Sequence, residues 1–292
     1  MSRRVREALL GYLLVTPALV VFGVFVFYPF ARNFYIGLYR TPPFPGLPRT
    51  YAGVDQYQDV LTDAEFLNSL KVTLLFVAYT VPAGIVLGLG LAVLAHQRLR
   101  GITIYRTIFS STVATSVAVA SVIFFTLLNP QVGLFTYWLG REGETSVLQD
   151  PTWALVAVSV TTIWQNLGLS FIIMSAGLQA VPDELLEAAR VDGAGAWSRF
   201  RNVTLPLLSP TLFFAIVVGS IIAFQAFGQI DLLTSGGPDD RTNVLVYYIY
   251  RTVFVSNNEG KAAVLAIALF AITLVLTLVQ LRILERRVTY ER

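Results

Sequence analysis

Long runs without a charged residue divide this 292-residue chain. Six of them, each 20 residues or longer, cover residues 8–31, 72–97, 107–140, 151–182, 202–230 and 262–281. An α-helix rises about 1.5 Å per residue, so roughly 20 apolar residues cross the hydrocarbon core of a bilayer. The pattern therefore predicts an all-α membrane protein with six membrane-spanning helices in one domain, 1–292. The expected helices cover approximately 9–31, 72–96, 107–128, 153–180, 205–230 and 262–282.

The composition supports a membrane protein over the alternatives. The chain is 55% hydrophobic and 13% charged, whereas soluble domains carry about 25% charged residues. A soluble enzyme with six buried helices of this kind would be unusual, and a β-barrel would show short alternating segments. The first run could belong to a signal peptide. However, its apolar stretch reaches Phe30 without a small-x-small cleavage site, so we expect an uncleaved helix.

The basic residues predict an orientation, because cytoplasmic loops are enriched in Lys and Arg. With the N-terminus inside, the inner segments hold 13 basic and 7 acidic residues, and the outer segments hold 8 basic and 11 acidic residues. This bias places both termini on the cytoplasmic side of the plasma membrane. The formal net charge of +3 then reflects how the chain is oriented in the membrane. We therefore expect no nucleic-acid partner.

The chain lacks the sequence motifs of an enzyme that acts alone. There is no phosphate-binding G-x-x-x-x-G-K-[ST] motif, no H-E-x-x-H, no cysteine pair and no G-x-S-x-G. We therefore expect no catalytic residue and no metal site. No Asp, Glu, Lys, Arg or His lies within a run except His96, near the end of the second run, whereas ion-coupled carriers keep carboxylates or histidines within the membrane. Both a membrane-embedded enzyme and an ion-coupled carrier are disfavoured, and the energy for uphill transport must come from another subunit.

The loop at 181–204 is the most informative segment. Asp183 and Glu184 fit a helix start, where the helix dipole favours acidic side chains. Gly193 then fits a turn, and Trp197 and Phe200 follow at helical spacing. Two short helices joined by a glycine turn predict a docking element. An amphipathic loop that lies on lipid is the alternative.

The same loop resembles a known motif. Glu187-Ala188-Ala189, Asp192-Gly193-Ala194, Phe200 and Leu205-Pro206 are similar to the EAA loop of permease subunits of binding-protein-dependent ABC importers. The resemblance implies the type I ABC importer permease fold. In that family the loop forms a coupling helix that fits a groove on the ATPase subunit. The coupling residues so implied are Glu187, Ala188, Ala189, Asp192 and Gly193.

Further stretches resemble one branch of that family. Residues 231–238 and the tyrosine-rich stretch at 247–250 are similar to the carbohydrate-type, maltose-permease-like branch. Residues 229–231 and the tail at 279–290 look closest to the first permease subunit of sn-glycerol-3-phosphate importers. The implied cargo is sn-glycerol-3-phosphate or a related glycerophosphodiester. A sugar or oligosaccharide remains the alternative, because no Lys or Arg inside a run offers a phosphate its countercharge.

The resemblance also implies an assembly. It consists of a second permease subunit in a heterodimer, two ATPase subunits, and an extracytoplasmic solute-binding protein. ATP and Mg would be bound by the ATPase subunits, so no cofactor is expected in this chain.

Substrate contacts must then come from uncharged polar groups within the apolar runs. Amides and hydroxyls in hydrocarbon are costly unless they are paired or line water. Hydrogen bonding between helices is an equally good explanation for any one of them. The candidates for the pathway are Thr162, Gln165, Asn166, Ser220 and Gln225.

Overall fold

A computed structural model describes the chain over residues 3–42, 44, 46–97, 100–138, 140 and 145–284. The described residues are mostly helical and form two compact units. One unit comprises Met1–Phe66 and Ile249–Phe270, and the other comprises Leu67–Tyr248 and Ala271–Arg292. The tail at 285–292, which contributes to the resemblance described above, lies outside the described residues.

The first unit contains the N-terminal helices and a small hairpin. Its elements in chain order are α1 (Arg3–Phe22), the π-helical turn η1 (Gly23–Phe27), α2 (Tyr28–Ile36), β1 (Tyr39–Arg40), β2 (Thr50–Tyr51), α3 (Asp55–Leu61), η5 (Arg251–Val255) and the start of α15 (Glu259–Leu284). The two strands pair antiparallel, with Tyr39 opposite Tyr51.

Charged side chains join the segments of this unit. Lys261 of α15 donates to Asp63 at 2.7 Å and lies 3.4 Å from Glu65, and Arg49 pairs with Glu259. The hydrogen bond from Lys261 holds the pKa of Asp63 below its usual value. These pairs bring the start of α15 beside the chain that precedes α4.

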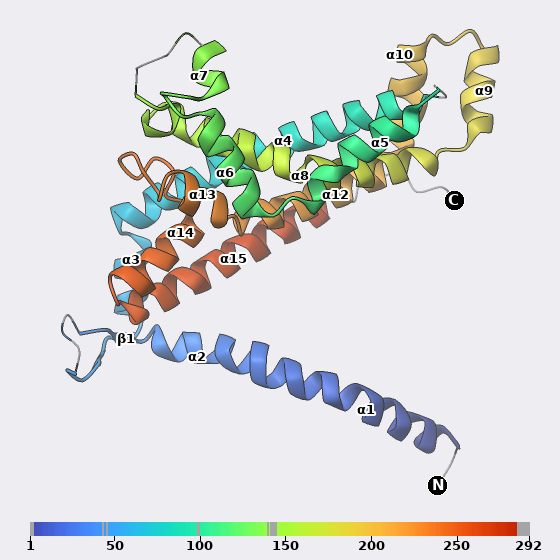
Figure 1. Cartoon of the computed structure of the whole chain (residues 1–292). Coiled ribbons are helices and arrows are strands. Elements are labelled where there is room, and N and C mark those ends of the chain that lie inside the picture. Colours follow the sequence, from blue (N-terminus) through green and yellow to red (C-terminus); the bar gives the residue numbers. More distant parts are fainter. Residues whose placement is uncertain are drawn as a thin grey trace. The chain divides into compact units, whose positions relative to one another are not determined.

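The second unit is a bundle around one long helix, α8 (Figure 1). Its other elements are α4 (Ala64–Ala95), α5 (Ile102–Ser110), η2 (Ser111–Ala114), α6 (Val117–Leu127), α7 (Leu134–Trp138), η3 (Val147–Gln149), α9 (Asp183–Val191), α10 (Ala196–Arg199), η4 (Phe200–Thr204), α11 (Leu205–Leu207), α12 (Ser209–Phe224), α13 (Gly228–Leu233) and α14 (Leu245–Tyr250). The long helix α8 itself covers Ala154–Gln179 and contacts α5, η2, α6 and α12.

Small residues let the neighbouring helices approach α8 closely. The backbone N–H of Gly168 donates to the Thr112 hydroxyl at 2.8 Å, and a side chain at Gly168 would collide with that oxygen. A side chain at Gly88 of α4 would likewise meet Ser170 of α8, and one at Gly177 would meet α12. Helices that pack in lipid depend on small residues at their contacts. These three contacts therefore fix α8 against its neighbours.

Four unbroken helices are long and apolar enough to cross a membrane, namely Leu10–Ile36, Ala64–Ala95, Ala154–Gln179 and Glu259–Ile283. Two further segments are bent. The first joins 102–114 to 117–127 at 103°, and the second joins 196–207 to 209–224 at 65°. In the part of the chain that the structure describes, the count is therefore four, or six if each bent pair is one span.

The bend near residue 115 replaces the single helix expected over 107–128. Thr115 adopts an extended conformation, and the side chain of Ser116 then caps α6 by accepting the N–H of Val119 at 3.2 Å. The side chain of Gln165 donates to the freed carbonyl of Thr115 at 3.3 Å. The chain can leave the helix here because neighbouring side chains satisfy the exposed backbone groups.

The helix expected over 205–230 also differs. It is divided at Leu208 between α11 and α12, and α12 ends at Phe224. Pro206 and Pro210 flank the first break, where their missing N–H groups weaken the helical ladder. The remaining residues of the expected span form the short helix α13 after a gap of three residues.

Candidate functional site

Helices α9 and α10 form a hairpin after the end of α8 (Figure 1). The turn between them is a Schellman motif. Gly193 has φ +82°, its N–H donates to the Arg190 carbonyl at 3.0 Å, and the N–H of Ala194 donates to the Ala189 carbonyl at 2.9 Å. Arg199 adds a bond from its Nη1 to the Ala194 carbonyl at 2.6 Å. Hydrogen bonds to residues of both α9 and α10 therefore stabilise the turn.

The outer surface of the hairpin is open and chemically mixed. Glu187, Ala188, Asp192 and Gly193 are exposed, and Ala189 is half-buried. The exposed apolar side chains are Leu185, Val191 and Trp197, of which Val191 is 87% exposed. Among the described residues, Glu187, Arg190 and Asp192 have no ion-pair partner. Exposed apolar side chains beside unpaired charges are typical of a surface that binds in a groove on a partner protein.

The root of the hairpin lies beside the ends of α4 and α8. Leu186 and Phe200 line a cleft together with Val93 of α4 and Leu178 of α8, and His96 lies at the same place. The rings of Trp197 and Phe200 stack with their centroids 5.6 Å apart. Because α9 contacts η4, which leads through α11 into α12, a motion of α9 would reach the bundle through η4.

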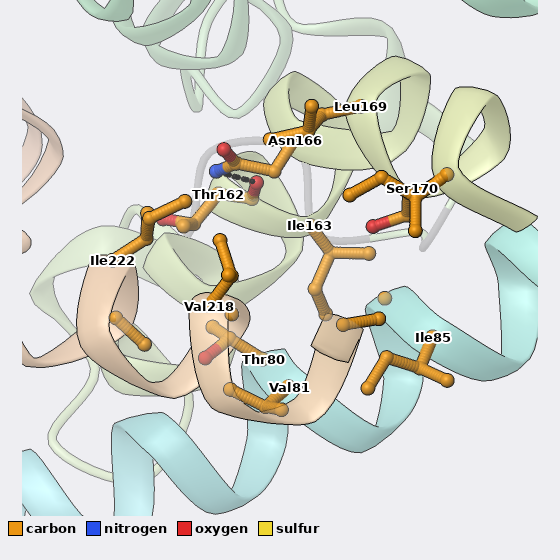
Figure 2. A pocket seen from close by; sticks show the side chains of 15 residues that line it. Thr80, Val81, Ile85, Thr162, Ile163, Asn166, Leu169, Ser170, Val218 and Ile222 are labelled. Atoms are coloured by element: carbon orange, nitrogen blue, oxygen red, sulfur yellow. Dashed lines mark hydrogen bonds between the residues drawn. The ribbon is translucent and has the colours of Figure 1, made fainter. Parts of the chain in front are cut away.

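A hollow opens between α4, α8 and α12 in the second unit (Figure 2). Its cavity volume is about 60 Å³, within about 560 Å³ of empty space that is partly open to the surroundings. Val81, Ile85, Val218 and Ile222 supply an apolar lining, and no charged residue lines it. The polar groups that line it are Thr80, Thr162, Asn166 and Ser170.

Two of the five pathway candidates, Thr162 and Asn166, line this hollow. The Thr162 hydroxyl donates to the Val158 carbonyl at 2.9 Å, and the Asn166 Nδ2 donates to the Thr162 carbonyl at 3.0 Å (Figure 2). The Asn166 side-chain oxygen has no described partner. It is therefore free to accept a hydrogen bond from a molecule in the hollow.

The other three candidates lie elsewhere. Gln165 bonds to the Thr115 carbonyl at the bend before α6. Ser220 donates to the Ile216 carbonyl and accepts from Gln280 Nε2 at 2.9 Å. Gln225 is exposed just after α12. Two of these side chains therefore make hydrogen bonds that hold segments of the bundle together.

Sequence reasoning missed Thr80 and Ser170. Ser170 follows Asn166 by four residues, so helical spacing places both on one face of α8. That spacing could have predicted Ser170. Nothing in the sequence singles out Thr80. Its hydroxyl donates to the Phe76 carbonyl of its own helix at 2.7 Å, and such bonds are common in apolar helices.

No group of three His, Cys, Asp or Glu side chains that could hold a metal ion occurs within the described residues. The polar groups that line the hollow of Figure 2 are neutral hydroxyl and amide groups.

Solved structures with a similar fold are ABC transporters. The chain matches "Crystal structure of a bacterial ABC transporter involved in the import of the acidic polysaccharide alginate" with a TM-score of 0.81 and 22% identity, over 97% of this chain and 98% of that one. It matches "Crystal structure of bacterial alginate ABC transporter in complex with alginate pentasaccharide-bound periplasmic protein" with the same TM-score and identity, over 97% of this chain and 96% of that one. These likenesses show the fold.

Sequence relatives are more similar. The chain is 39% identical to the sn-glycerol-3-phosphate transport system permease protein UgpA of Rhizobium meliloti (strain 1021), with 97% of each chain covered. It is 38% identical to the protein of the same name from Agrobacterium fabrum, over the same shares. Residues 81–290 match the family described as binding-protein-dependent transport system inner membrane component. This chain belongs to the family of inner membrane components of binding-protein-dependent transport systems.

Proposed function

We propose that this permease subunit carries sn-glycerol-3-phosphate or a related glycerophosphodiester in an ATP-driven importer. The observation that carries the proposal is the relatedness to permeases named for that substrate, at 33–39% identity over nearly the whole chain. The subunit has no ATPase site of its own, so ATP and Mg are bound by partner subunits, and this chain needs no cofactor.

A sugar or oligosaccharide importer is the second candidate. The hollow between α4, α8 and α12 favours it, because hydroxyl and amide groups suit a neutral polyol and no Lys or Arg lines the space. A phosphate dianion would have to find its countercharge on the second permease subunit or at helix N-termini.

The proposed assembly places the termini and the α9–α10 hairpin on the cytoplasmic side of the plasma membrane. The distribution of Arg and Lys supports this orientation. Two ATPase subunits serve the importer, and one of them would receive α9 of this chain. A second permease subunit would complete the pathway, and an extracytoplasmic solute-binding protein would deliver the substrate on the other side. The unpaired charges and exposed apolar side chains of α9 fit a docked helix.

Coupling would depend on the stiffness of the hairpin. When the ATPase subunits close, the groove around α9 moves, and Glu187 makes polar contacts in it while Ala188 and Ala189 permit close approach. Asp192 and Gly193 end the helix in the Schellman turn, so α9 moves as one piece. Its contact with η4, which leads into α11 and α12, would transmit the motion to the bundle, which switches between two packed states.

Thr162 and Asn166 would contact the substrate. The free Asn166 oxygen can accept a hydrogen bond from a substrate hydroxyl, and Thr80 and Ser170 add hydroxyl groups to the same hollow. A pathway role for Gln165, Ser220 and Gln225 stays a prediction.

The substrate is tested by uptake into proteoliposomes that contain this chain, its second permease and its ATPase, with the binding protein added outside. We expect ATP-dependent accumulation of labelled sn-glycerol-3-phosphate that excess unlabelled glycerophosphodiester reduces and excess maltose does not. Accumulation of a sugar in place of the phosphate ester would contradict the proposal and support the second candidate.

Two substitutions in the hairpin test coupling. Gly193→Pro forces φ to about −65° where the turn needs +82°, and it removes the N–H that donates to Arg190. Glu187→Lys reverses an exposed charge on the docking face. With either change, we expect the assembled importer to retain ATP hydrolysis while uptake falls at least tenfold. The ratio of transported substrate to released phosphate measures this effect.

A matched control separates coupling from general damage. Gly195→Ala changes a nearby glycine that has φ −66° and open space around it. It should keep a normal ratio. Normal uptake by Gly193→Pro and Glu187→Lys would refute the coupling role.

Asn166→Ala and Gln165→Ala form a second pair, because these adjacent residues have different surroundings. Asn166→Ala should lower uptake several-fold with little change in the thermal midpoint of the purified complex. Gln165→Ala should remove the bond to the Thr115 carbonyl and cost about 1 kcal/mol of stability. Thermal unfolding in detergent and uptake are measured on both variants. Unchanged uptake by Asn166→Ala would exclude it from the pathway.

A further inference from the structure

A second hollow lies between the end of α4, α5 and α8, and it shares no lining residue with the hollow of Figure 2. Its lining is more polar and includes His96, Thr103, Arg106, Ser175 and Gln179. No Asp or Glu lines it, so the charge of its described lining is positive.

Arg106 supplies the charge. Its Nε and Nη2 donate to the carbonyl of Ala95, the last residue of α4, at 3.1 and 2.8 Å. A guanidinium group has five N–H donors, so three remain after these two bonds. Arg106 has no ion pair with a described residue, and its side chain is exposed. The bonds to Ala95 hold the guanidinium at the hollow with one edge free.

Ser175 provides a second, independent observation. Its hydroxyl oxygen is buried and has no hydrogen-bond partner among the described atoms, although Ser175 lines the hollow. A buried polar group without a partner costs about 1–3 kcal/mol. The hydroxyl of Ser110, which lines the same hollow, donates to the Thr107 carbonyl of its own helix. Ser175 therefore lines the same hollow as a guanidinium with unused donors, and rotation about its Cα–Cβ bond can turn the unpartnered hydroxyl toward an acceptor there.

The surface beside the hollow is apolar. Ile104 and Ile108 of α5 are 66% and 56% exposed, and Ile172 of α8 is also exposed. Basic pockets between membrane helices that adjoin apolar surface are suited to the headgroup and the first part of the acyl chains of an anionic lipid. A small soluble anion would use only the polar part.

We propose that this hollow binds a phosphate group, with Arg106 as its charged ligand and Ser175 and His96 as further donors. A guanidinium group matches the geometry of phosphate oxygens in a bidentate contact. The phosphate can belong to an anionic phospholipid or to a free phosphate ion. The site does not depend on which substrate the importer carries.

The test is native mass spectrometry of the purified full chain in a neutral detergent, titrated with phosphatidylglycerol or with phosphatidylcholine. We expect phosphatidylglycerol to bind at least tenfold more tightly. Arg106→Gln, which keeps a donor for Ala95, should weaken phosphatidylglycerol binding about tenfold or more, as expected for lost charge-assisted hydrogen bonds. Ser175→Ala should weaken it about fivefold, as expected for one lost hydrogen bond.

Ser159→Ala is the control, because Ser159 lies on the same helix and its buried hydroxyl already bonds the Leu155 carbonyl at 2.7 Å. It should bind lipid like the unchanged chain. Ser175→Ala removes only an unpartnered hydroxyl, so it should fold even if Arg106→Gln does not.

Inorganic phosphate separates the two sources. If millimolar phosphate displaces the bound lipid and raises the thermal midpoint of the lipid-free chain, and Ser175→Ala weakens both effects, the ligand is a free phosphate. If phosphate has neither effect, while Ser175→Ala still weakens the binding of phosphatidylglycerol, the ligand is the lipid headgroup. Equal binding of the two lipids with no effect of phosphate would overturn the site. Binding of either probe that Arg106→Gln and Ser175→Ala leave unchanged would also overturn it.

Discussion

The hydrocarbon core of a bilayer offers no water, so a backbone N–H or C=O that leaves a helix there must find a partner within the protein. This constraint explains both the long helices and the places where they break. At the bend after α5 and η2, Ser116 caps α6 and Gln165 satisfies the Thr115 carbonyl. The backbone is irregular there because neighbouring side chains replace its helical bonds.

The same lack of water removes the hydrophobic attraction between helices, so contact depends on how closely their backbones can approach. Gly88, Gly168 and Gly177 provide that approach around α8. A bundle fixed by close contacts at defined points can move between two packings but cannot deform gradually. Such a bundle suits a gate that is driven from one end, and the α9–α10 hairpin lies at the end of α8.

The sequence predicted much of this from local rules. Charge-free length predicted the apolar helices, and the acids at 183 and 184 with the glycine at 193 predicted the short helix and its turn. The bends could not be predicted, because Thr115 leaves the helix only where Gln165, fifty residues later, can satisfy its carbonyl. The same contact gives the Gln165 amide, which is costly in lipid when unpaired, a partner in the backbone of the bend.

The α9–α10 hairpin is proposed to face the cytoplasm, where an ATPase subunit covers it. The chain contains no cysteine, so Val191→Cys, at an 87% exposed position, gives a single label site. A membrane-impermeant maleimide should label it in inside-out vesicles stripped of the ATPase, much less when the ATPase is bound, and not in spheroplasts. Leu47→Cys, on the expected outer side, should show the reverse sidedness. Labelling of Val191→Cys in spheroplasts would contradict the proposed orientation and, with it, the coupling role of the hairpin.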